Sequence, residues 1–138
     1  MFPSSTHILV VDDMGAMRLR IVNQLKKMGY ENISQAENGQ EAFDLVAKAK
    51  TDMTPIELVL SDWNMPVLSG LEFLKKLRGT FQYKDLPFLM VTAEGEKDQV
   101  LEAIKSGVSD YVIKPVSPDD LKGKLQNVFA KHNKEKAG

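Results

Sequence analysis

The sequence contains no cysteine among its 138 residues. This absence excludes disulfide bonds, thiolate catalysis and cysteine-ligated zinc, and it agrees with a reducing compartment. Aromatic residues make up only 7% of the chain, and the formal net charge is −1. A chain this close to neutrality has no general electrostatic attraction for nucleic acid or for an anionic membrane surface. We therefore expect neither among its partners.

Long hydrophobic runs are also absent. The uninterrupted apolar runs span only a few residues, whereas a helix that crosses a bilayer needs about 20. Residues 1–7 lack the basic cluster and apolar stretch of a secretory signal. We expect a cytoplasmic protein, and its length suits a single domain with a core of its own.

Short apolar runs alternate with longer stretches of helical period, which is typical of a parallel sheet with helices on both faces. The runs predict strands at residues 8–11, 32–36, 56–60, 87–91 and 109–113. Helices are expected between them: one ends at Gly29, one follows Asn38-Gly39, one ends near Gly79, one runs from 94–96 to Gly107, and the last begins at Ser117-Pro118. We predict one domain over residues 6–131, a frayed polar tail over 132–138 and no output domain.

Polar residues stand where four of these apolar runs stop. Asp12 and Asp13 follow the first run, Asp62 lies just beyond the third, Thr92 ends the fourth and Lys114 follows the fifth. Because parallel strands end at one shared edge, we expect these side chains to meet there. Three adjacent carboxylates repel one another unless a cation is present. Hard oxygen ligands without histidine or cysteine favour Mg²⁺.

This set of residues suits phosphoryl transfer. The carboxylate of Asp62 could attack phosphorus to give an acyl phosphate, and the ammonium of Lys114 could pair with a phosphoryl oxygen. Each residue alone also has a simpler explanation. Asp12 or Asp13 could cap the following helix, Asp62 could form an Asx turn toward Pro66, and Lys114 could be solvated. The combination at one edge favours the chemical interpretation.

Four segments resemble the receiver domain of two-component response regulators, and among these the single-domain chemotaxis regulators. They are Val10-Val11-Asp12-Asp13, Ser61-Asp62-Trp63-Asn64-Met65-Pro66 followed by Gly70, Val91-Thr92-Ala93-Glu94, and Tyr111-Val112-Ile113-Lys114-Pro115. The resemblance implies a doubly wound, flavodoxin-like (βα)5 fold of the α/β class. It also implies a five-stranded parallel sheet in the order 2-1-3-4-5.

The same resemblance implies a role for each matched residue. Asp62 would accept a phosphoryl group from a phosphohistidine. Mg²⁺, the only cofactor expected, would be held by Asp12, Asp13, Asp62 and the backbone carbonyl of Asn64. Lys114 would then neutralise the phosphoryl charge.

Further roles concern the response to phosphorylation. Thr92 and the backbone amide of Ala93 would engage the phosphoryl oxygens. Thr92 would also act with Tyr111 as the switch, whereas Asn64 and Glu94 would set the lifetime of the phosphorylated state. The protein would catalyse only its own phosphorylation and a slow autodephosphorylation.

The implied partners are a sensor histidine kinase and a downstream protein, which is either a flagellar motor switch protein or a phosphatase. The receiver itself would be a monomer or a weak dimer. A phosphorelay intermediate or stand-alone regulator of another enzyme remains an open alternative. A turnover phosphatase of the haloacid dehalogenase type is disfavoured because its Asp-x-Asp nucleophile motif is absent from the first strand. Nucleotide or flavin binding is disfavoured because no glycine-rich phosphate loop follows that strand.

Overall fold

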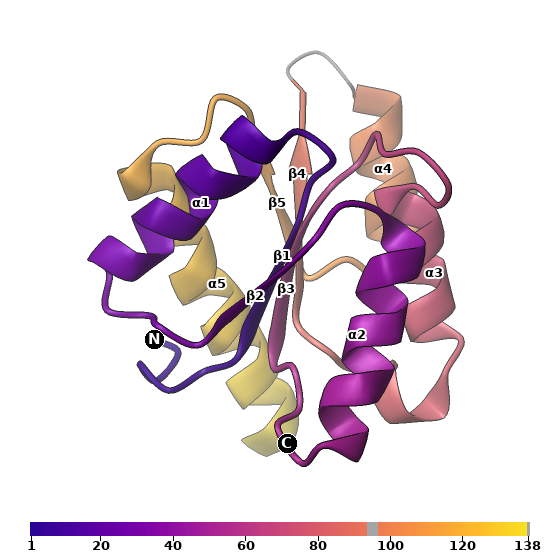
Figure 1. Cartoon of the computed structure of the whole chain (residues 1–138), viewed down its shortest axis with the longest axis horizontal. Coiled ribbons are helices and arrows are strands. Elements are labelled where there is room, and N and C mark those ends of the chain that lie inside the picture. The colour runs from indigo at the N-terminus through magenta and orange to yellow at the C-terminus, as the bar shows by residue number, and fades with distance from the viewer. Residues whose placement is uncertain (94–96, 138) are drawn as a thin grey trace.

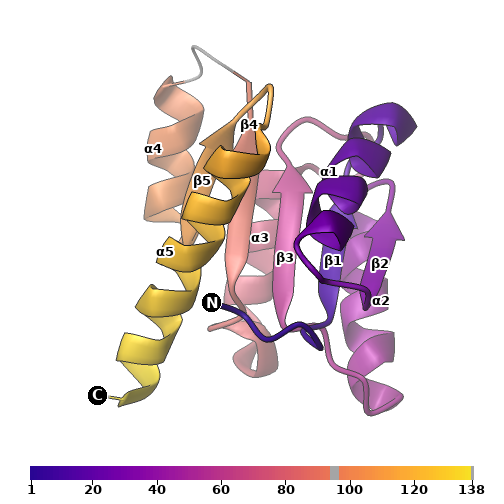
Figure 2. The same ribbon diagram turned by 90° about the vertical axis from the view of Figure 1, so that its left-hand side faces the viewer.

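The computed structural model describes residues 1–93 and 97–137, with side chains through His132. Its centre is a parallel sheet of five strands in the order β2-β1-β3-β4-β5. The strands are β1 (Ile8–Val11), β2 (Ile33–Ala36), β3 (Leu58–Asp62), β4 (Phe88–Thr92) and β5 (Asp110–Ile113). All five therefore end at one edge of the sheet, the upper edge in Figure 2. The predicted fold class and strand order are confirmed.

Helices cover both faces of the sheet (Figure 1). On one face lie α1 (Gly15–Lys27) and α5 (Pro118–Ala137). On the other lie α2 (Gly39–Thr51), α3 (Gly70–Arg78) and α4 (Lys97–Lys105). A short 3-10 helix, η1 (Phe81–Tyr83), precedes β4. Among the described residues, no helix lies across the edge formed by the strand ends.

Polar caps determine where several helices begin. The side chain of Asn38 accepts a hydrogen bond from the amide of Glu41 at 2.8 Å and caps α2. Ser69 and Glu72 form a reciprocal capping box at the start of α3. The Ser117 hydroxyl accepts from the amide of Asp120 at 3.1 Å, as its position before Pro118 predicts.

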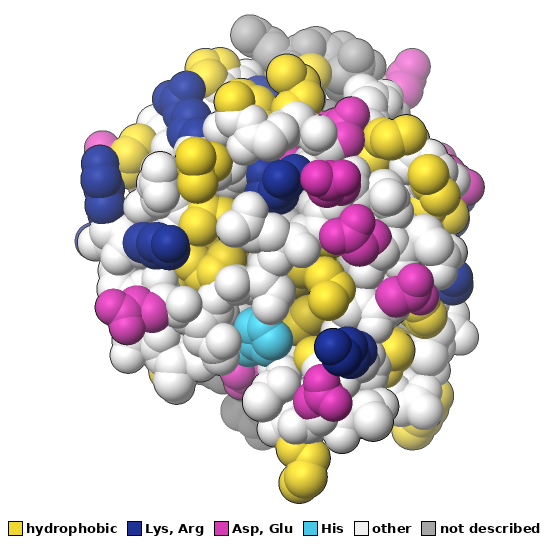
Figure 3. Space-filling model, viewed as in Figure 1, with side chains coloured by type: hydrophobic (Ala, Val, Ile, Leu, Met, Phe, Trp, Pro, Cys, Tyr) yellow, Lys and Arg dark blue, Asp and Glu magenta, His cyan; other side chains and the backbone are white. Residues whose placement is uncertain are grey.

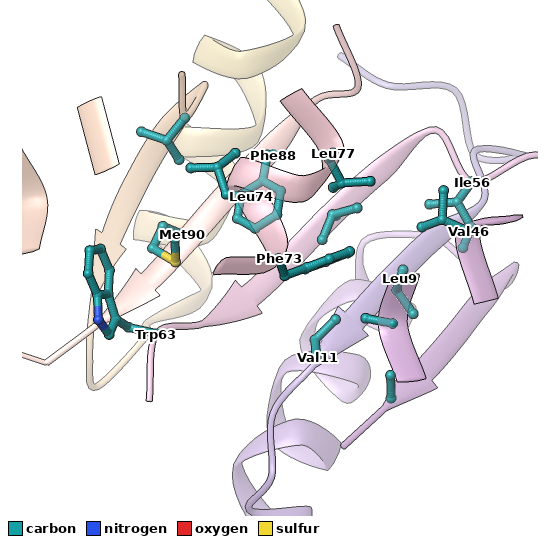
Figure 4. Close-up of a cluster of buried hydrophobic side chains, with 14 of the residues drawn as sticks. Leu9, Val11, Val46, Ile56, Trp63, Phe73, Leu74, Leu77, Phe88 and Met90 are labelled. Carbon is teal, nitrogen blue, oxygen red and sulfur yellow. The ribbon is translucent and has the colours of Figure 1, made fainter. Parts of the chain in front are cut away.

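The two faces of the sheet bury separate hydrophobic clusters. β1, β3 and β4 are buried at every position, as expected for central parallel strands covered on both sides. Figure 4 shows the cluster on the α2–α4 side, where Phe73, Leu74 and Leu77 of α3 pack near Phe88 of β4. The second cluster joins α1 and α5 to the opposite face. This packing fixes the strands that carry the polar edge.

Two expectations need correction and one lies outside the described residues. β3 begins at Leu58, not at residue 56, and it includes Asp62 as its last residue. The tail that we expected to fray after residue 131 continues α5 to Ala137. The start of the fourth helix was expected at residues 94–96, which are not described. Among the described residues, no helix has both the length and the hydropathy to cross a membrane.

Candidate functional site

Three carboxylates converge at the edge where the strands end. Asp12 and Asp13 directly follow β1, and Asp62 ends the neighbouring strand β3. One carboxylate oxygen from each of the three residues lies within 4.8 Å of the other two. Asp12 and Asp62 are buried, whereas Asp13 is exposed. The sequence prediction that these residues meet is confirmed.

Asp12 is held by hydrogen bonds at its amide and at Oδ1, and among the described residues its second carboxylate oxygen has only the ammonium of Lys114 as a partner, at 3.5 Å. Its amide donates to the carbonyl of Ala36 at 3.1 Å, which anchors it to β2. Its Oδ1 accepts a hydrogen bond from the amide of Met14 at 2.9 Å. Its Oδ2 is buried and has no hydrogen-bond partner among the described residues. A buried carboxylate oxygen without a donor is costly unless a cation satisfies it.

Asp62 uses one oxygen for hydrogen bonds and keeps the other available. Oδ1 accepts from the amide of Trp63 at 2.8 Å and from Nζ of Lys114 at 3.1 Å. Oδ2 accepts no hydrogen bond from the described part of the chain. Burial raises the pKa of the Asp62 carboxyl, an effect that the Lys114 ammonium opposes and the negative charge of Asp12 reinforces.

Lys114 is the cation that faces this acidic group. Its Nζ lies 3.1 Å from Oδ1 of Asp62 and 3.5 Å from Oδ2 of Asp12, and its side chain is 21% exposed. Its amide also donates to the carbonyl of Thr92 at 2.8 Å. One ammonium against three ionised carboxylates leaves the group with an excess of negative charge. The site is therefore electrostatically prepared for a further cation.

These residues fit a magnesium ion. All three acidic side chains offer hard oxygen ligands, the donors that Mg²⁺ prefers, and neither histidine nor cysteine belongs to the described cluster. Oδ2 of Asp12 accepts no hydrogen bond from the described residues, and the Lys114 ammonium 3.5 Å away is its one ion-pair partner there, so this oxygen can still ligate a metal ion. The arrangement can thus bring a divalent cation beside the free oxygen of Asp62.

Thr92 lies on β4, which pairs with the acceptor strand β3, and Tyr111 lies on β5, the edge strand beyond β4. Thr92 ends β4 and pairs with Ile113, and its buried hydroxyl has no hydrogen-bond partner among the described residues. Tyr111 of β5 is half-buried and packs against the hydrophobic cluster on the α2–α4 side. The ammonium of Lys124 lies 4.8 Å from the centre of its ring.

The remaining predicted site residues lie on loops around this centre. Asn64 follows Trp63 in the β3–α3 loop and is exposed. Ala93 follows Thr92 and is also exposed. Glu94, which the resemblance associates with the lifetime of the phosphorylated state, lies outside the described residues.

The structure also gives supporting roles to two residues for which we predicted none, Gly70 and Arg18. Gly70 donates its amide to the carbonyl of Trp63 at 2.8 Å, and a Cβ at Gly70 would overlap the carbonyl oxygen of Asp62. Arg18 donates to the backbone carbonyl of Asp12 at 2.6 Å. A glycine at the first position of a helix, where it is a poor helix former, could have suggested the close approach at Gly70. No sequence pattern marks Arg18.

The comparison with known families agrees with this geometry. The model of the response regulator receiver domain matches residues 8–126. The chain belongs to this family. Receiver domains of this kind are phosphorylation-activated switches of two-component signalling and not enzymes that turn over a separate substrate.

Curated relatives and solved structures support the same assignment. The chemotaxis protein CheY homolog of Campylobacter jejuni is 43% identical over 122 residues, which cover 88% of this chain and 91% of the relative. CheY1 of Helicobacter pylori is 43% identical over 123 residues, covering 88% and 95%. The solved structure of the response regulator CheY4 of Vibrio cholerae superposes with a TM-score of 0.76 at 35% identity, covering 90% of this chain and 98% of that one.

Proposed function

We propose that this receiver works in chemotaxis. Asp62 accepts a phosphoryl group from a phosphohistidine of a CheA-like kinase in the cytoplasm, and the phosphorylated form then binds a flagellar motor switch protein. The observation that carries the proposal is the meeting of Asp12, Asp13 and Asp62, with the ammonium of Lys114 beside Asp12 and Asp62. The similarity to chemotaxis proteins of the CheY type supports the choice of pathway.

The geometry of Asp62 suits the role of nucleophile. Its Oδ1 is occupied by Trp63 and Lys114, so Oδ2 remains to attack phosphorus. An oxygen–phosphorus bond forms as the nitrogen–phosphorus bond to the donor imidazole breaks. A bound Mg²⁺ would offset the charge of the carboxylates and of the incoming phosphoryl oxygens, with Asp12, Asp13, Asp62 and the Asn64 carbonyl as its protein ligands.

Lys114 and Thr92 link phosphorylation to a change of conformation. Lys114 already lies within 3.1 Å of Asp62 and would pair with a phosphoryl oxygen. The buried hydroxyl of Thr92 has no hydrogen-bond partner among the described residues, and a phosphoryl oxygen on Asp62 would accept a hydrogen bond from it. The backbone amide of Ala93 would donate a second hydrogen bond to the phosphoryl group. Movement of Thr92 would free space for the ring of Tyr111 and shift the population toward the active form. Asn64 and Glu94 would set how slowly the acyl phosphate hydrolyses itself.

The output surface lies beside this switch. Leu101 and Ile104 of α4 are 56% and 54% exposed, and Ile113 of β5 is 43% exposed. Exposed apolar side chains are suited to docking a partner segment, and Ile113 lies on the same strand as the half-buried Tyr111. We propose this surface, completed by α5, as the contact for the motor switch protein.

Mass spectrometry of the intact protein tests the phosphorylation step. Incubation with acetyl phosphate and Mg²⁺ should add one phosphoryl group to the wild-type protein, and peptide mapping should locate it at Asp62. Asp62→Asn should abolish the added mass. Asp44→Asn provides the matched control because Asp44 lies on α2, outside the acidic cluster. Equal labelling of Asp62→Asn would identify another acceptor and reject the proposal.

Binding to a motor switch peptide tests the pathway separately. The beryllofluoride-treated protein should bind the peptide more tightly than the untreated protein, and Ile104→Ser should weaken that binding without reducing phosphorylation. A protein that is phosphorylated at Asp62 but does not bind the peptide would belong to a phosphorelay or to another regulatory pathway. That result would retain the receiver chemistry and reject the motor target.

A further inference from the structure

Arg18 lies one turn inside α1, but its side chain points back toward the end of β1. Its backbone amide donates to the carbonyl of Met14 at 3.0 Å. Its Nη1 donates to the carbonyl of Asp12 at 2.6 Å, and its Nε donates to Oε1 of Gln35 at 3.0 Å. Its Nη2 lies 3.9 Å from Oε1 of Glu37. One guanidinium therefore joins the loop that follows β1 to the edge strand β2 and the residues after it.

This environment separates Arg18 from the other cations of α1. The helix carries no acidic residue, and its remaining basic residues, Arg20, Lys26 and Lys27, are exposed. Figure 3 shows Lys and Arg side chains on the left of the molecule and others near its centre and at the lower right. The side chain of Arg18 is only 16% exposed. Its contacts are directed ones that a solvated surface charge would not make.

The contact with Asp12 acts on the neighbouring acidic residue. The carbonyl of Asp12 and the amide of Asp13 belong to one planar peptide unit, so fixing the carbonyl also fixes the direction in which the chain reaches Asp13. Asp13 itself is exposed, and its side chain makes no hydrogen bond to the described residues. Two hydrogen bonds therefore orient this segment: the Met14 amide donates to Oδ1 of Asp12, and Arg18 donates to the Asp12 carbonyl.

We propose that Arg18 is a positioning residue for the metal site. It holds the Asp12–Asp13 peptide so that the Asp13 carboxylate faces the oxygens of Asp12 and Asp62. The inference rests on the proposed use of Mg²⁺ at this cluster, and it extends that proposal to a residue that touches neither metal nor phosphoryl group.

The direction in which Mg²⁺ affinity changes when Arg18 is removed distinguishes a positioning role from a purely electrostatic one. A cation near the site repels Mg²⁺, so if charge were its main effect, removal of Arg18 would tighten metal binding. Loss of orientation instead weakens binding, because Asp13 is no longer directed to the site. Lysine retains the charge but cannot reproduce the fork of contacts to Asp12, Gln35 and Glu37.

Calorimetric titration with Mg²⁺ tests the proposal, with Trp63 fluorescence as a second readout. Arg18→Ala should bind Mg²⁺ about 10-fold more weakly than wild type, and Arg18→Lys should fall between them. Acetyl-phosphate labelling of Arg18→Ala should need more Mg²⁺ for half-maximal rate but reach the wild-type rate at saturation. Arg20→Ala is the matched control and should retain wild-type affinity, because Arg20 is exposed on the same helix.

Unchanged or tighter Mg²⁺ binding by a folded Arg18→Ala protein would overturn the proposal, even if its melting temperature fell. Gln35→Ala provides a second test, because Gln35 is exposed and its loss removes the partner of Nε without removing the arginine. It should also weaken Mg²⁺ binding, and wild-type affinity would count against the proposal. A wild-type protein that bound no Mg²⁺ would reject the metal site itself, a result distinct from a selective failure of the Arg18 variants.

Discussion

Replacing Gly70 by alanine would test how closely the β3–α3 loop packs on the acceptor residue. The buried Gly70 opens α3 and donates its amide to the Trp63 carbonyl at 2.8 Å. A Cβ at this position would overlap the carbonyl oxygen of Asp62 and lie 3.0 Å from its carbonyl carbon and 3.1 Å from Cα of Trp63. All three atoms belong to the backbone, so no side-chain rotation relieves the overlap. The loop or the end of β3 must move by roughly 1 Å.

This displacement should affect both stability and phosphorylation. Overpacking of a buried site costs about 1–3 kcal/mol, which corresponds to a fall in melting temperature of roughly 3–10 °C for a domain of this size. A shift of about 1 Å in a reacting group can slow its reaction by about 100-fold. Thermal unfolding followed by circular dichroism measures the first effect, and the rate of acetyl-phosphate labelling measures the second.

Gly123→Ala is the matched control for this substitution. Gly123 lies inside α5, and a Cβ there would meet no atom within 4 Å. Alanine should therefore stabilise the helix by up to about 1 kcal/mol and leave labelling unchanged. If Gly70→Ala melted and was labelled like the wild type, the loop could move without cost. The close packing on Asp62 would then have no functional importance.

Three further predictions concern the charged and polar groups of the site. Without divalent cations, Asp62→Asn should stabilise the protein at pH 7. Burial raises the pKa of Asp62 in the folded state, so its ionisation opposes folding. In denaturant titrations the stability gained by Asp62→Asn should disappear as the pH falls through the pKa of Asp62 in the folded protein toward its pKa in the unfolded chain. Lys114→Ala should lower apo stability by about 1–3 kcal/mol by removing the ammonium that faces Asp12 and Asp62, yet calorimetry should still detect Mg²⁺ binding. Thr92→Val should raise stability by about 1 kcal/mol in thermal unfolding, because it removes a buried hydroxyl that has no hydrogen-bond partner among the described residues. Beryllofluoride should then no longer alter the Tyr111 resonances in NMR spectra.

The strand ends were predictable because two independent patterns coincide there. Apolar runs define buried parallel strands, and the polar residue that ends each run must lie at the common edge of the sheet. This reasoning correctly brought Asp12, Asp62 and Lys114 together. It ended the third strand at residue 60, two residues too early, because pairing of Asp62 with Val91 of β4 extends β3 through a charged residue. Strand pairing is a tertiary effect that hydrophobic pattern alone does not report.

Other features depend on contacts between distant backbone and side-chain atoms. The contact of Arg18 with the Asp12 carbonyl and the approach of Gly70 to Asp62 leave no periodic signal in the sequence. The length of α5 was also missed, because the polar residues after Lys131 resemble a solvated tail although the helix continues to Ala137. Ile104 fits the helical period of α4, yet it is 54% exposed. Periodicity identifies the helix but not which of its apolar residues remain uncovered.

The unsatisfied polar groups suggest why the resting site is prepared to respond. Among the described residues, the buried oxygens without a hydrogen-bond partner include Oδ2 of Asp12 and the hydroxyl of Thr92, both at this edge of the sheet. The Thr92 hydroxyl costs about 1–3 kcal/mol, the Lys114 ammonium at 3.5 Å satisfies Oδ2 of Asp12 only in part, and the raised pKa of Asp62 adds a further cost of ionisation. A divalent cation would satisfy Asp12 and favour the ionised, nucleophilic form of Asp62. A phosphoryl oxygen would then offer Thr92 its missing partner, so the energy that favours the active conformation comes from groups left unsatisfied in the resting one.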